Sequence, residues 1–294
     1  MSDTIFITGA AGHLGGAVVR HLLDRRVAPE RIVAGTRHPE KLADLAARGV
    51  TVRKADFDDV PGLTSAFAGA GTVLIISTDV LTQDGHRLRQ HRNAVQAAVA
   101  AGVRHLAYTS LPAPETSPIS FAPDHALTEE ALHATGLPVT VFRNGWYHEN
   151  LFMSVPAALR SGHWYTASEQ GRTSYAARDE IAEAIAAVLA EAPSGSRTYT
   201  LTGSEAFTVE EIAALVRTST GKPLDVVHVT DDQLAAGLAA AGVPEGIVPI
   251  LVSMEVATRA GSLGIVTDDL ATILGRTPTS LQAFIADKAG ALSG

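Results

Sequence analysis

The sequence predicts an α/β protein with a Rossmann-type, doubly wound parallel sheet and a smaller, mainly helical C-terminal subdomain. Short, fully apolar runs rich in β-branched residues alternate with Ala/Leu-rich helical patterns, the first strand-to-helix turn is rich in glycine, and the alternation changes after Tyr147. Apolar strands separated by helices are typical of a parallel sheet covered on both faces. Right-handed crossovers then give the doubly wound arrangement.

The first half of the chain supplies six strands and five helices in alternation. We expect the strands at Thr4–Thr8, Arg31–Thr36, Thr51–Lys54, Thr72–Ile76, His105–Thr109 and Pro138–Arg143. We expect the helices near Leu14–Arg25, Pro39–Arg48, Val60–Phe67, Gly85–Ala101 and Asp124–Thr135. These elements predict that residues 1–150 form the Rossmann domain.

The second half is expected to divide between two parts. A strong helical pattern and a late strand predict that residues 176–203 return to the Rossmann domain, while residues 151–175 and 204–294 form the smaller, substrate-side subdomain. Two capping boxes, Thr208 with Glu211 and Thr230 with Gln233, predict helix starts in that subdomain.

Composition narrows the classes of function. The chain has 294 residues, 46% hydrophobic and 18% charged, with a net charge of −8 and no long basic run, which disfavours nucleic-acid binding. It has no Cys and no His-x-x-x-His pair, so we expect no metal. Its apolar runs are shorter than the ~20 residues needed to span a bilayer, and no signal-peptide pattern opens it. We therefore expect a cytoplasmic protein that does not bind membranes.

The glycine loop is the first functional motif. "TGAAGHLGG" places Gly9, Gly12 and Gly15 between an apolar strand and a helix. These glycines permit a tight turn, close approach of a pyrophosphate and close helix packing, and the helix N-terminus favours an anion. A glycine-rich turn without a ligand is the alternative, but the flanking strand and helix favour a dinucleotide.

The end of the second strand indicates which dinucleotide. NAD-selective sites place an acid here, whereas this chain places Arg37, followed by His38. A guanidinium binds a 2′-phosphate that a carboxylate would repel, so Arg37 favours NADP(H), although a solvated surface arginine is the alternative. Asp56 either accepts from the adenine amino group or caps the next helix. Ser77 and Thr78, after the fourth strand, are plausible neighbours of the ribose.

The Tyr-x-x-x-Lys pair that serves as proton donor in short-chain dehydrogenases is absent. None of the four lysines is preceded by tyrosine at that spacing. Reduction of a ketone puts charge on a strongly basic alkoxide and needs a positioned acid. Reduction of a quinone gives a phenolate-like oxygen, which a loosely placed donor or water can protonate. The absence therefore argues against alcohol chemistry and is compatible with quinone reduction or with no catalysis.

Several segments together resemble the NmrA-like atypical short-chain dehydrogenases, most of all the bacterial type two NAD(P)H:quinone oxidoreductases, relatives of triphenylmethane-dye reductase. They are "TGAAGHLGG", "RHPEK", "QHRNAVQAAVAAGV", "AYTSL", "HALTEEAL" and "FRNGWYHEN". The resemblance covers nearly the whole chain and implies NADPH bound along the Rossmann cleft. The cofactor-binding residues expected on these grounds are Thr8, Gly9, Ala11, Gly12, His13, Leu14, Arg37, Asp56, Ser77, Thr78, Tyr108, Asn144, Gly145, Trp146 and Tyr147.

Two side chains are candidate catalytic residues. Tyr147, in "GWY", offers a phenol and, with Trp146, a stacking surface for a flat ligand, although both rings could instead pack between subdomains. His125 lies where the tyrosine of the missing pair would lie, one helical turn before Glu129, and is either a proton donor or a structural histidine.

The sequence thus predicts an NADPH-dependent reductase of a quinone or similar planar small molecule, as a monomer or homodimer. Two alternatives stay open: a non-catalytic redox sensor of NmrA type that acts through a protein partner, and a dye or azo reductase.

Overall fold

The structure is a computed structural model that describes residues 4–294. The chain divides into two compact units. The first contains the described residues up to Leu111 together with residues 124–143 and 181–199, and the second contains residues 112–123, 144–180 and 200–294. The boundary after Arg143 therefore comes before the position 150 that the sequence suggested.

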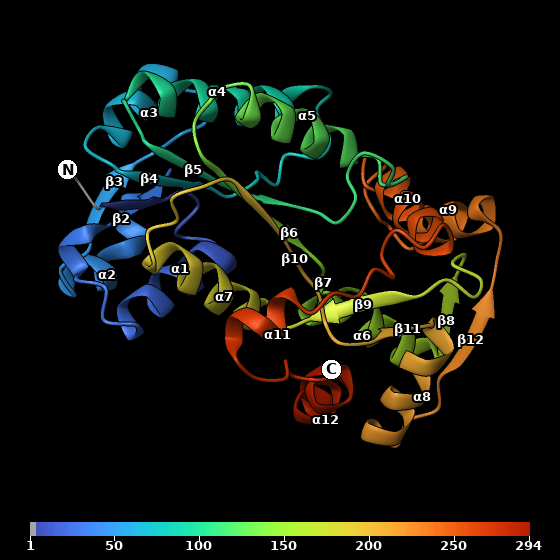
Figure 1. Ribbon diagram of the computed structural model, residues 1–294. Helices are drawn as coiled ribbons and strands as arrows, with labels where there is room; N and C mark the ends of the chain where they lie inside the picture. The colour runs from blue at the N-terminus through green and yellow to red at the C-terminus, as the bar shows by residue number, and fades with distance from the viewer. Residues whose placement is uncertain (1–3) are drawn as a thin grey trace. The chain divides into compact units, whose positions relative to one another are not determined.

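A seven-stranded sheet forms the centre of the first unit (Figure 1). Its strands, in spatial order, are β10 (Arg197–Leu201), β6 (Val139–Asn144), β5 (His105–Ser110), β4 (Thr72–Ile75), β1 (Ile5–Ile7), β2 (Ile32–Thr36) and β3 (Thr51–Lys54). The pairs from β6 through β3 are all parallel. This order, with crossovers to both sides of β1, confirms the predicted Rossmann-type doubly wound sheet.

Helices cover both faces of this sheet. On one face lie α3 (Val60–Phe67), α4 (His86–Ala100) and α5 (Ala122–His133); on the other lie α1 (His13–Asp24), α2 (Ala43–Ala47) and α7 (Arg178–Ala190) (Figure 1). Two 3₁₀ turns, η1 (Pro29–Arg31) and η2 (Pro39–Leu42), flank β2. The strands are apolar because both faces are buried: β1 and β2 are buried at every position.

Most predicted elements of the first half lie within one or two residues of their expected ends. The exception is Pro39–Arg48, expected as one helix, which is a 3₁₀ turn followed by the short α2. The backbone of Leu42, with φ −113° and ψ 22°, leaves the helical region and separates the two.

The second unit is built from helices and two small sheets. Its helices are α6 (Leu151–Ser161), α8 (Val209–Thr220), α9 (Asp231–Ala240), α10 (Val248–Arg259), α11 (Asp269–Leu274) and α12 (Leu281–Leu292), with the 3₁₀ turn η3 (His148–Asn150) before α6. One sheet holds β11 (Ala206–Phe207), β9 (Thr173–Ala176) and β7 (Trp146–Tyr147), and the other pairs β12 (Asp225–His228) with β8 (His163–Thr166). Both predicted capping boxes are present, at the starts of α8 and α9.

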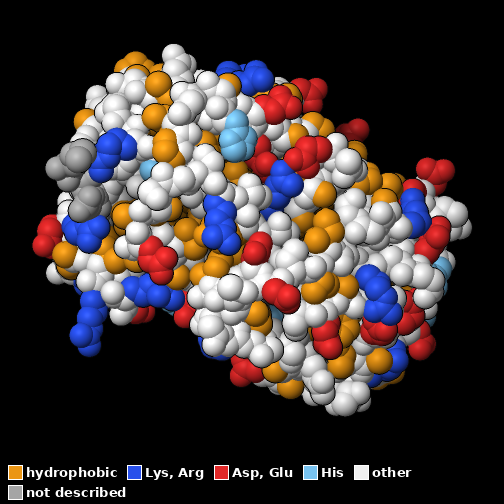
Figure 2. Space-filling view, viewed as in Figure 1, with side chains coloured by type: hydrophobic (Ala, Val, Ile, Leu, Met, Phe, Trp, Pro, Cys, Tyr) orange, Lys and Arg blue, Asp and Glu red, His pale blue; other side chains and the backbone are white. Residues whose placement is uncertain are grey.

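Each unit has its own core. In the first, the rings of Phe6 and Phe67 meet edge to face 4.8 Å apart within a cluster of buried aliphatic side chains. In the second, Trp164, Ile212 and Phe284 belong to a cluster between α6, α8 and α12. Over the face seen in Figure 2, acidic and basic side chains are interspersed. Within residues 4–294, each helix is too short or too polar to cross a bilayer.

Candidate functional site

The glycine loop between β1 and α1 folds into a tight turn. Gly9 has a φ of +62°, which favours glycine, and its carbonyl accepts a hydrogen bond from the Gly12 amide at 2.9 Å. A Cβ atom on Gly15 would lie 2.4 Å from the Gly9 carbonyl oxygen, so a side chain at this position would push the loop and the helix apart.

Helix α1 begins directly behind this loop without a capping side chain. Gly12 is the N-cap residue, no side chain accepts a hydrogen bond there, and the first turn carries no acidic residue. The amide groups of a helix start need acceptors and carry partial positive charge. The loop therefore leaves a helix terminus that a phosphate group can approach.

A cavity of about 390 Å³ lies against this loop, inside the first unit. It brings together nine of the sequence-predicted cofactor residues: Gly9, Ala11, Gly12, His13, Leu14, Arg37, Asp56, Ser77 and Thr78. Gly15, the third glycine of the predicted loop, also lines it. Sequence reasoning did not single out several further lining residues, namely Thr36, Lys41, Ala55, Phe57, Ile76, Asp79 and Gln90. The only available signal for Lys41 was its place in "RHPEK", four residues after Arg37.

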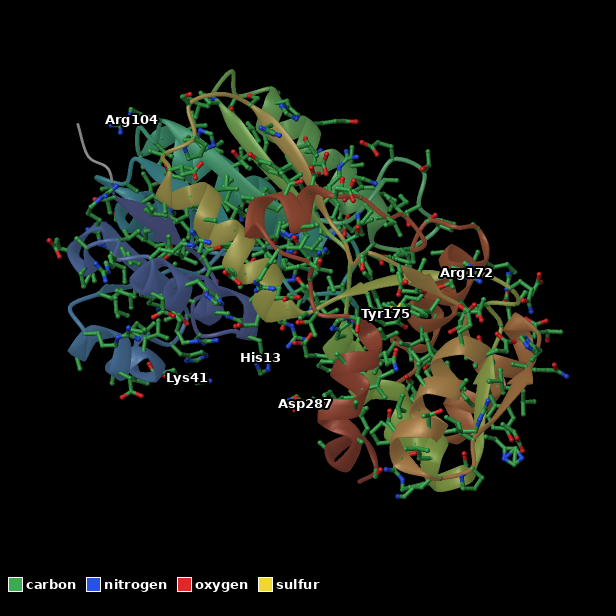
Figure 3. All side chains as sticks on the ribbon, turned by 60° about the horizontal axis from the view of Figure 1, so that its bottom comes forward. His13, Lys41, Arg104, Arg172, Tyr175 and Asp287 are labelled. Carbon is green, nitrogen blue, oxygen red and sulfur yellow. The ribbon has the colours of Figure 1, made fainter. Side chains whose placement is uncertain are left out.

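The cavity wall after β2 is basic. Arg37, His38 and Lys41 all line it. The side chains of Arg37 and Lys41 are exposed and make no hydrogen bond or ion pair with another residue in the range 4–294, whereas Nδ1 of His38 lies 3.3 Å from Glu40 Oε1. His13 and Lys41, labelled in Figure 3, lie on the same side of the unit. Two cations without partners can neutralise a bound phosphate.

The sequence left two roles open for Asp56, contact with the adenine and capping of the next helix. Its Oδ1 accepts a hydrogen bond from the Asp58 amide at 3.1 Å, which makes an Asx turn, and the residue also lines the cavity. The N-cap of α3 is Asp59, whose Oδ1 accepts from the Gly62 amide at 3.0 Å. Asp56 therefore does not cap the helix itself.

Thr8 holds the end of β4 in place. Its Oγ1 donates to the Leu74 carbonyl at 3.0 Å and accepts from the Ile76 amide at 2.8 Å, and the side chain is fully buried. It is not among the residues that line the cavity. Its contribution to the site is therefore to fix the strand end that presents Ser77 and Thr78.

A buried polar network lies behind that strand end. The Thr78 amide donates to Nε2 of His91 at 3.1 Å, so the His91 proton is on Nδ1, which points at Thr128 Oγ1 and the Tyr108 hydroxyl at 3.0 and 3.3 Å. Nδ1 of His125 lies 2.8 Å from the same hydroxyl. Tyr108 is fully buried in this network and does not line the cavity, although the sequence suggested it for the nicotinamide end.

His125 is enclosed on both sides of its ring. A guanidinium nitrogen of Arg87 lies 2.8 Å from Nε2, and the ring is 3% exposed. Burial, together with the neighbouring Arg87 charge, lowers the pKa of His125 well below its usual value. The same causes lower the pKa of His91 to about 3. Both rings are therefore neutral near pH 7, an arrangement that favours a structural role for His125.

Glu129 occupies the position of the lysine in the missing pair. It accepts from Ser110 Oγ at 2.6 Å, and its two oxygens accept from Nε and a terminal nitrogen of Arg143 at 3.1 and 2.6 Å. This bidentate pair is buried on the carboxylate side. Helix α5 therefore carries a neutral imidazole and a buried acid four residues apart.

The "NGWY" segment belongs to the second unit. The Asn144 amide nitrogen donates to the Tyr147 hydroxyl at 3.2 Å, while Asn144 Oδ1 is buried with no hydrogen-bond partner among the described residues. The Arg178 guanidinium lies 4.9 Å from the centre of the Tyr147 ring. Burial raises the pKa of Tyr147, and the Asn144 bond and the Arg178 charge oppose that rise.

Gly145 and Trp146 complete the segment. A Cβ atom on Gly145 would lie 3.0 Å from the Leu201 carbonyl oxygen, so this position favours glycine. Trp146, in β7, lines a second and larger cavity that lies inside the second unit. Among residues 4–294, no group of three His, Cys, Asp or Glu side chains is placed to hold a metal ion.

Residues 1–273 match the model of the NmrA-like family. The chain belongs to the NmrA-like family. Among curated proteins, it is 39% identical to Quinone oxidoreductase 2 of Escherichia coli (strain K12), over 96% of this chain and 97% of that protein. It is 24% identical to NAD(P)H azoreductase of Xenophilus azovorans over 95% of this chain and 96% of that one.

Solved NmrA-like structures agree with this assignment. The NADPH-dependent quinone oxidoreductase QOR2 of Escherichia coli, solved in complex with NADPH, superposes with a TM-score of 0.91 at 38% identity, covering 99% of this chain and 100% of that one. The triphenylmethane reductase of Citrobacter sp., solved with NADP(H), gives a TM-score of 0.89 at 34% identity, covering 97% and 100%. The transcriptional regulator NmrA, at 16% identity, shares the fold.

Proposed function

We propose that this NmrA-like protein is an NADPH-dependent oxidoreductase that passes hydride to a quinone or a similar planar acceptor. The observation that carries the proposal is the cavity at the glycine loop, with an uncapped helix start and the unpaired cations Arg37 and Lys41 in its wall. The 39% identity to a quinone oxidoreductase over nearly the full chain supports the reaction class.

The residues of this cavity fit the cofactor. The turn at Gly9 and the absence of side chains at Gly12 and Gly15 let a pyrophosphate approach the start of α1. Arg37 and Lys41 would hold the 2′-phosphate, and this pair of cations would favour NADPH over NADH. Asp56, Ser77 and Thr78 would contact the adenosine side. Asn144 lies in the second unit and does not line this cavity, but its orphaned Oδ1 has the chemistry to accept a hydrogen bond from a carboxamide.

Bound NADPH would supply a hydride, and one further proton would complete the hydroquinone, so that the two electrons lost by the cofactor equal those gained by the quinone. We assign the proton to Tyr147. Its oxygen accepts from Asn144, and its own proton is donated to no other residue within 4–294. His125, the other candidate, is a poor donor because its ring is neutral and both nitrogens are engaged.

A panel of benzoquinones and naphthoquinones with NADPH, followed by the cofactor absorbance, tests the proposal. We expect oxidation of NADPH in step with loss of quinone, and slower oxidation of NADH. If no acceptor in the panel is reduced while NADPH binds, a reductase of quinones is excluded.

Reduction of an azo or triphenylmethane dye is the second candidate, favoured by the azoreductase relative and by the triphenylmethane reductase structure. Bleaching of a dye with NADPH would support it. A redox sensor is the third candidate, for which titration with NADP⁺ and NADPH separately gives the test: a sensor requires different affinities and no turnover.

We also propose that the protein is cytoplasmic and either a monomer or a homodimer, as the sequence indicates. Cell fractionation and size-exclusion chromatography with light scattering measure the two properties directly.

A further inference from the structure

The second unit contains a cavity of about 820 Å³ that shares no lining residue with the cavity at the glycine loop. Its walls come from α6, the small sheets, α8, α9 and α10. Helix α6 presents one face to it, through residues at helical spacing: Leu151, Ser154, Ala157, Ala158 and Ser161, with Asn150 of η3 just before them. Helix α9 does the same with Gln233, Leu234, Gly237 and Leu238, and its C-cap residue Ala241 also contributes.

The lining is mostly apolar and strongly aromatic. Trp146, Trp164, Tyr175 and Phe207 all contribute, and Tyr175, labelled in Figure 3, comes from β9. Of the large hydrophobic side chains that are exposed in the described chain, Met153 (65% exposed) and Tyr165 (53%) also line this cavity. Apolar side chains left open to water at the mouth of a concave apolar site are typical of a ligand-binding surface.

One carboxyl group provides the charged end of the cavity. Oε2 of Glu255 accepts from Thr166 Oγ1 at 2.6 Å and from the Ala167 amide at 2.9 Å. Its other oxygen makes no hydrogen bond or ion pair with a residue in the described range. The lining contains no lysine or arginine, so an anionic ligand has no cation to pair with, and a group that donates a hydrogen bond has an acceptor.

We propose that this cavity binds the acceptor, and that the acceptor is a flat molecule of at least two fused rings carrying a neutral hydrogen-bond donor that faces Glu255. The proposal rests on the proposed reductase function and names its substrate class. Cavities of about 300–1,000 Å³ enclose ligands of drug size, so a single benzoquinone ring fills this one poorly. A fused-ring acceptor stacks on the aromatic lining and buries more apolar area.

The chain carries its own reporter for this cavity. Trp146 and Trp164 are its two tryptophans, and both line the cavity. Quinone binding there should quench the intrinsic fluorescence, measured against free N-acetyltryptophanamide to correct for absorption by the quinone. We expect saturable quenching by 2-methyl-1,4-naphthoquinone, and at least about tenfold weaker binding of unsubstituted benzoquinone.

Two substitutions fill the cavity from separate walls, Gly237→Leu on α9 and Ala157→Leu on α6. A Cβ atom on Gly237 meets no other atom within 4 Å, so the first atom of the new side chain causes no clash. Gly290→Leu is the matched control, because Gly290 is an equally open helical glycine that does not line the cavity. We expect the filled variants to bind the naphthoquinone at least about tenfold more weakly, and Gly290→Leu to stay within about twofold.

Glu255→Gln tests whether the hydrogen-bond donor of the bound acceptor molecule faces the Glu255 carboxylate. We expect the wild-type protein to bind 2-amino-1,4-naphthoquinone several-fold more tightly than the 2-methyl compound of similar size, and the variant to lose this preference. An unchanged preference would overturn the role of Glu255, and unchanged quenching in both filled variants would overturn the cavity as the acceptor site.

The proposed acceptor site and the proposed reductase function can be refuted independently of each other. If the filled variants oxidise NADPH with unchanged KM for naphthoquinones, the cavity assignment is wrong and the reductase function stands. If the wild-type protein reduces no quinone but the filled variants still abolish naphthoquinone quenching, the cavity binds planar aromatics and the reductase function is wrong. NADPH affinity, measured by calorimetry, should be the same in every variant.

Discussion

Arg87 donates a hydrogen bond to Nε2 of His125 across 2.8 Å in the interior of the first unit. Because a guanidinium can only donate, this contact fixes the neutral tautomer of His125 with its proton on Nδ1, directed at Tyr108. A second proton on the ring would place a cation against a buried cation. The network therefore holds an imidazole that resists protonation.

This network predicts a loss of stability in mild acid. The pKa of His91 is lowered to about 3 by burial and by Arg87, and that of His125 also lies well below the unfolded value near 6.5. As the pH falls, the two rings therefore bind protons in the unfolded chain but not in the folded chain. Their contribution to the free energy of unfolding is fully present above pH 6.5 and is lost as the pH drops through the unfolded pKa. At pH 5 we expect His91 to lower the free energy of unfolding by about 2 kcal/mol, and His125 to act in the same direction.

Urea unfolding at pH 7.5 and pH 5.0 measures this effect. His91→Asn should lower stability at pH 7.5 but flatten its pH dependence. His163→Asn, a change at an exposed ring outside this network, is the matched control. Equal unfolding free energies of the wild-type protein at the two pH values would show that the rings are not held neutral.

Arg37→Ala should weaken NADPH much more than NADH. The 2′-phosphate is the difference between the two cofactors, and hydrogen bonds between charged groups are worth about 1.5–3 kcal/mol, so we expect the NADPH affinity to fall about 10-fold to 100-fold. Lys41→Ala should act in the same direction. Lys54→Ala removes an exposed cation outside the cavity and serves as the control in calorimetric titrations. An equal loss for both cofactors would place Arg37 away from the 2′-phosphate.

Gly15→Ala should damage both the loop and cofactor binding. The new Cβ atom would lie 2.4 Å from the Gly9 carbonyl oxygen, so the loop and α1 must separate, at a cost of about 1–3 kcal/mol for overpacking. Gly12→Ala, with a nearest contact of 3.2 Å, should be milder. Thermal unfolding and NADPH titration of the two variants give the comparison, and Gly290→Ala in α12 controls for the gain in helix propensity. A Gly15→Ala protein that binds NADPH normally would contradict the close packing of loop and helix.

The sheet and the glycine-loop cavity could be predicted because local patterns determine them. Apolar strands followed by helices define the crossovers, and the carboxyl ends of parallel strands bring Arg37, Asp56 and Ser77 to one edge although they are far apart in sequence. The small sheets of the second unit carry no such signal. In β12, Asp225 pairs with His163 across 62 residues, and strands of two to four residues are too short for periodicity to reveal.

The surroundings of individual side chains could not be predicted from the sequence either. Tyr108 follows the same strand-end rule as Ser77, but its side chain points into the interior, where His91 and His125 surround it. Strand position gives the face of the sheet to which a side chain belongs, not the helix that covers it. The large cavity of the second unit is equally a product of packing, since its walls come from separate segments.

Tyr147→Phe should lower kcat for quinone reduction while leaving the affinity for NADPH unchanged. The phenol is the proposed proton source, and a positioned acid is worth about 10²–10⁴ in rate. We expect a loss near the lower end, about 100-fold or less, because water can also protonate the phenolate-like product.

Arg178→Gln removes the cation 4.9 Å from the ring that opposes the burial-driven rise in the Tyr147 pKa. It should therefore slow the reaction through a weaker hydrogen bond to the product oxygen, while Arg178→Lys should restore part of the rate. Tyr199→Phe, which alters a phenol stacked on Phe142 in the first unit, is the control. Steady-state rates across pH 6 to 9 decide the matter: if Tyr147→Phe and Tyr199→Phe give the same kcat, the proton comes from solvent and Tyr147 only shapes the site.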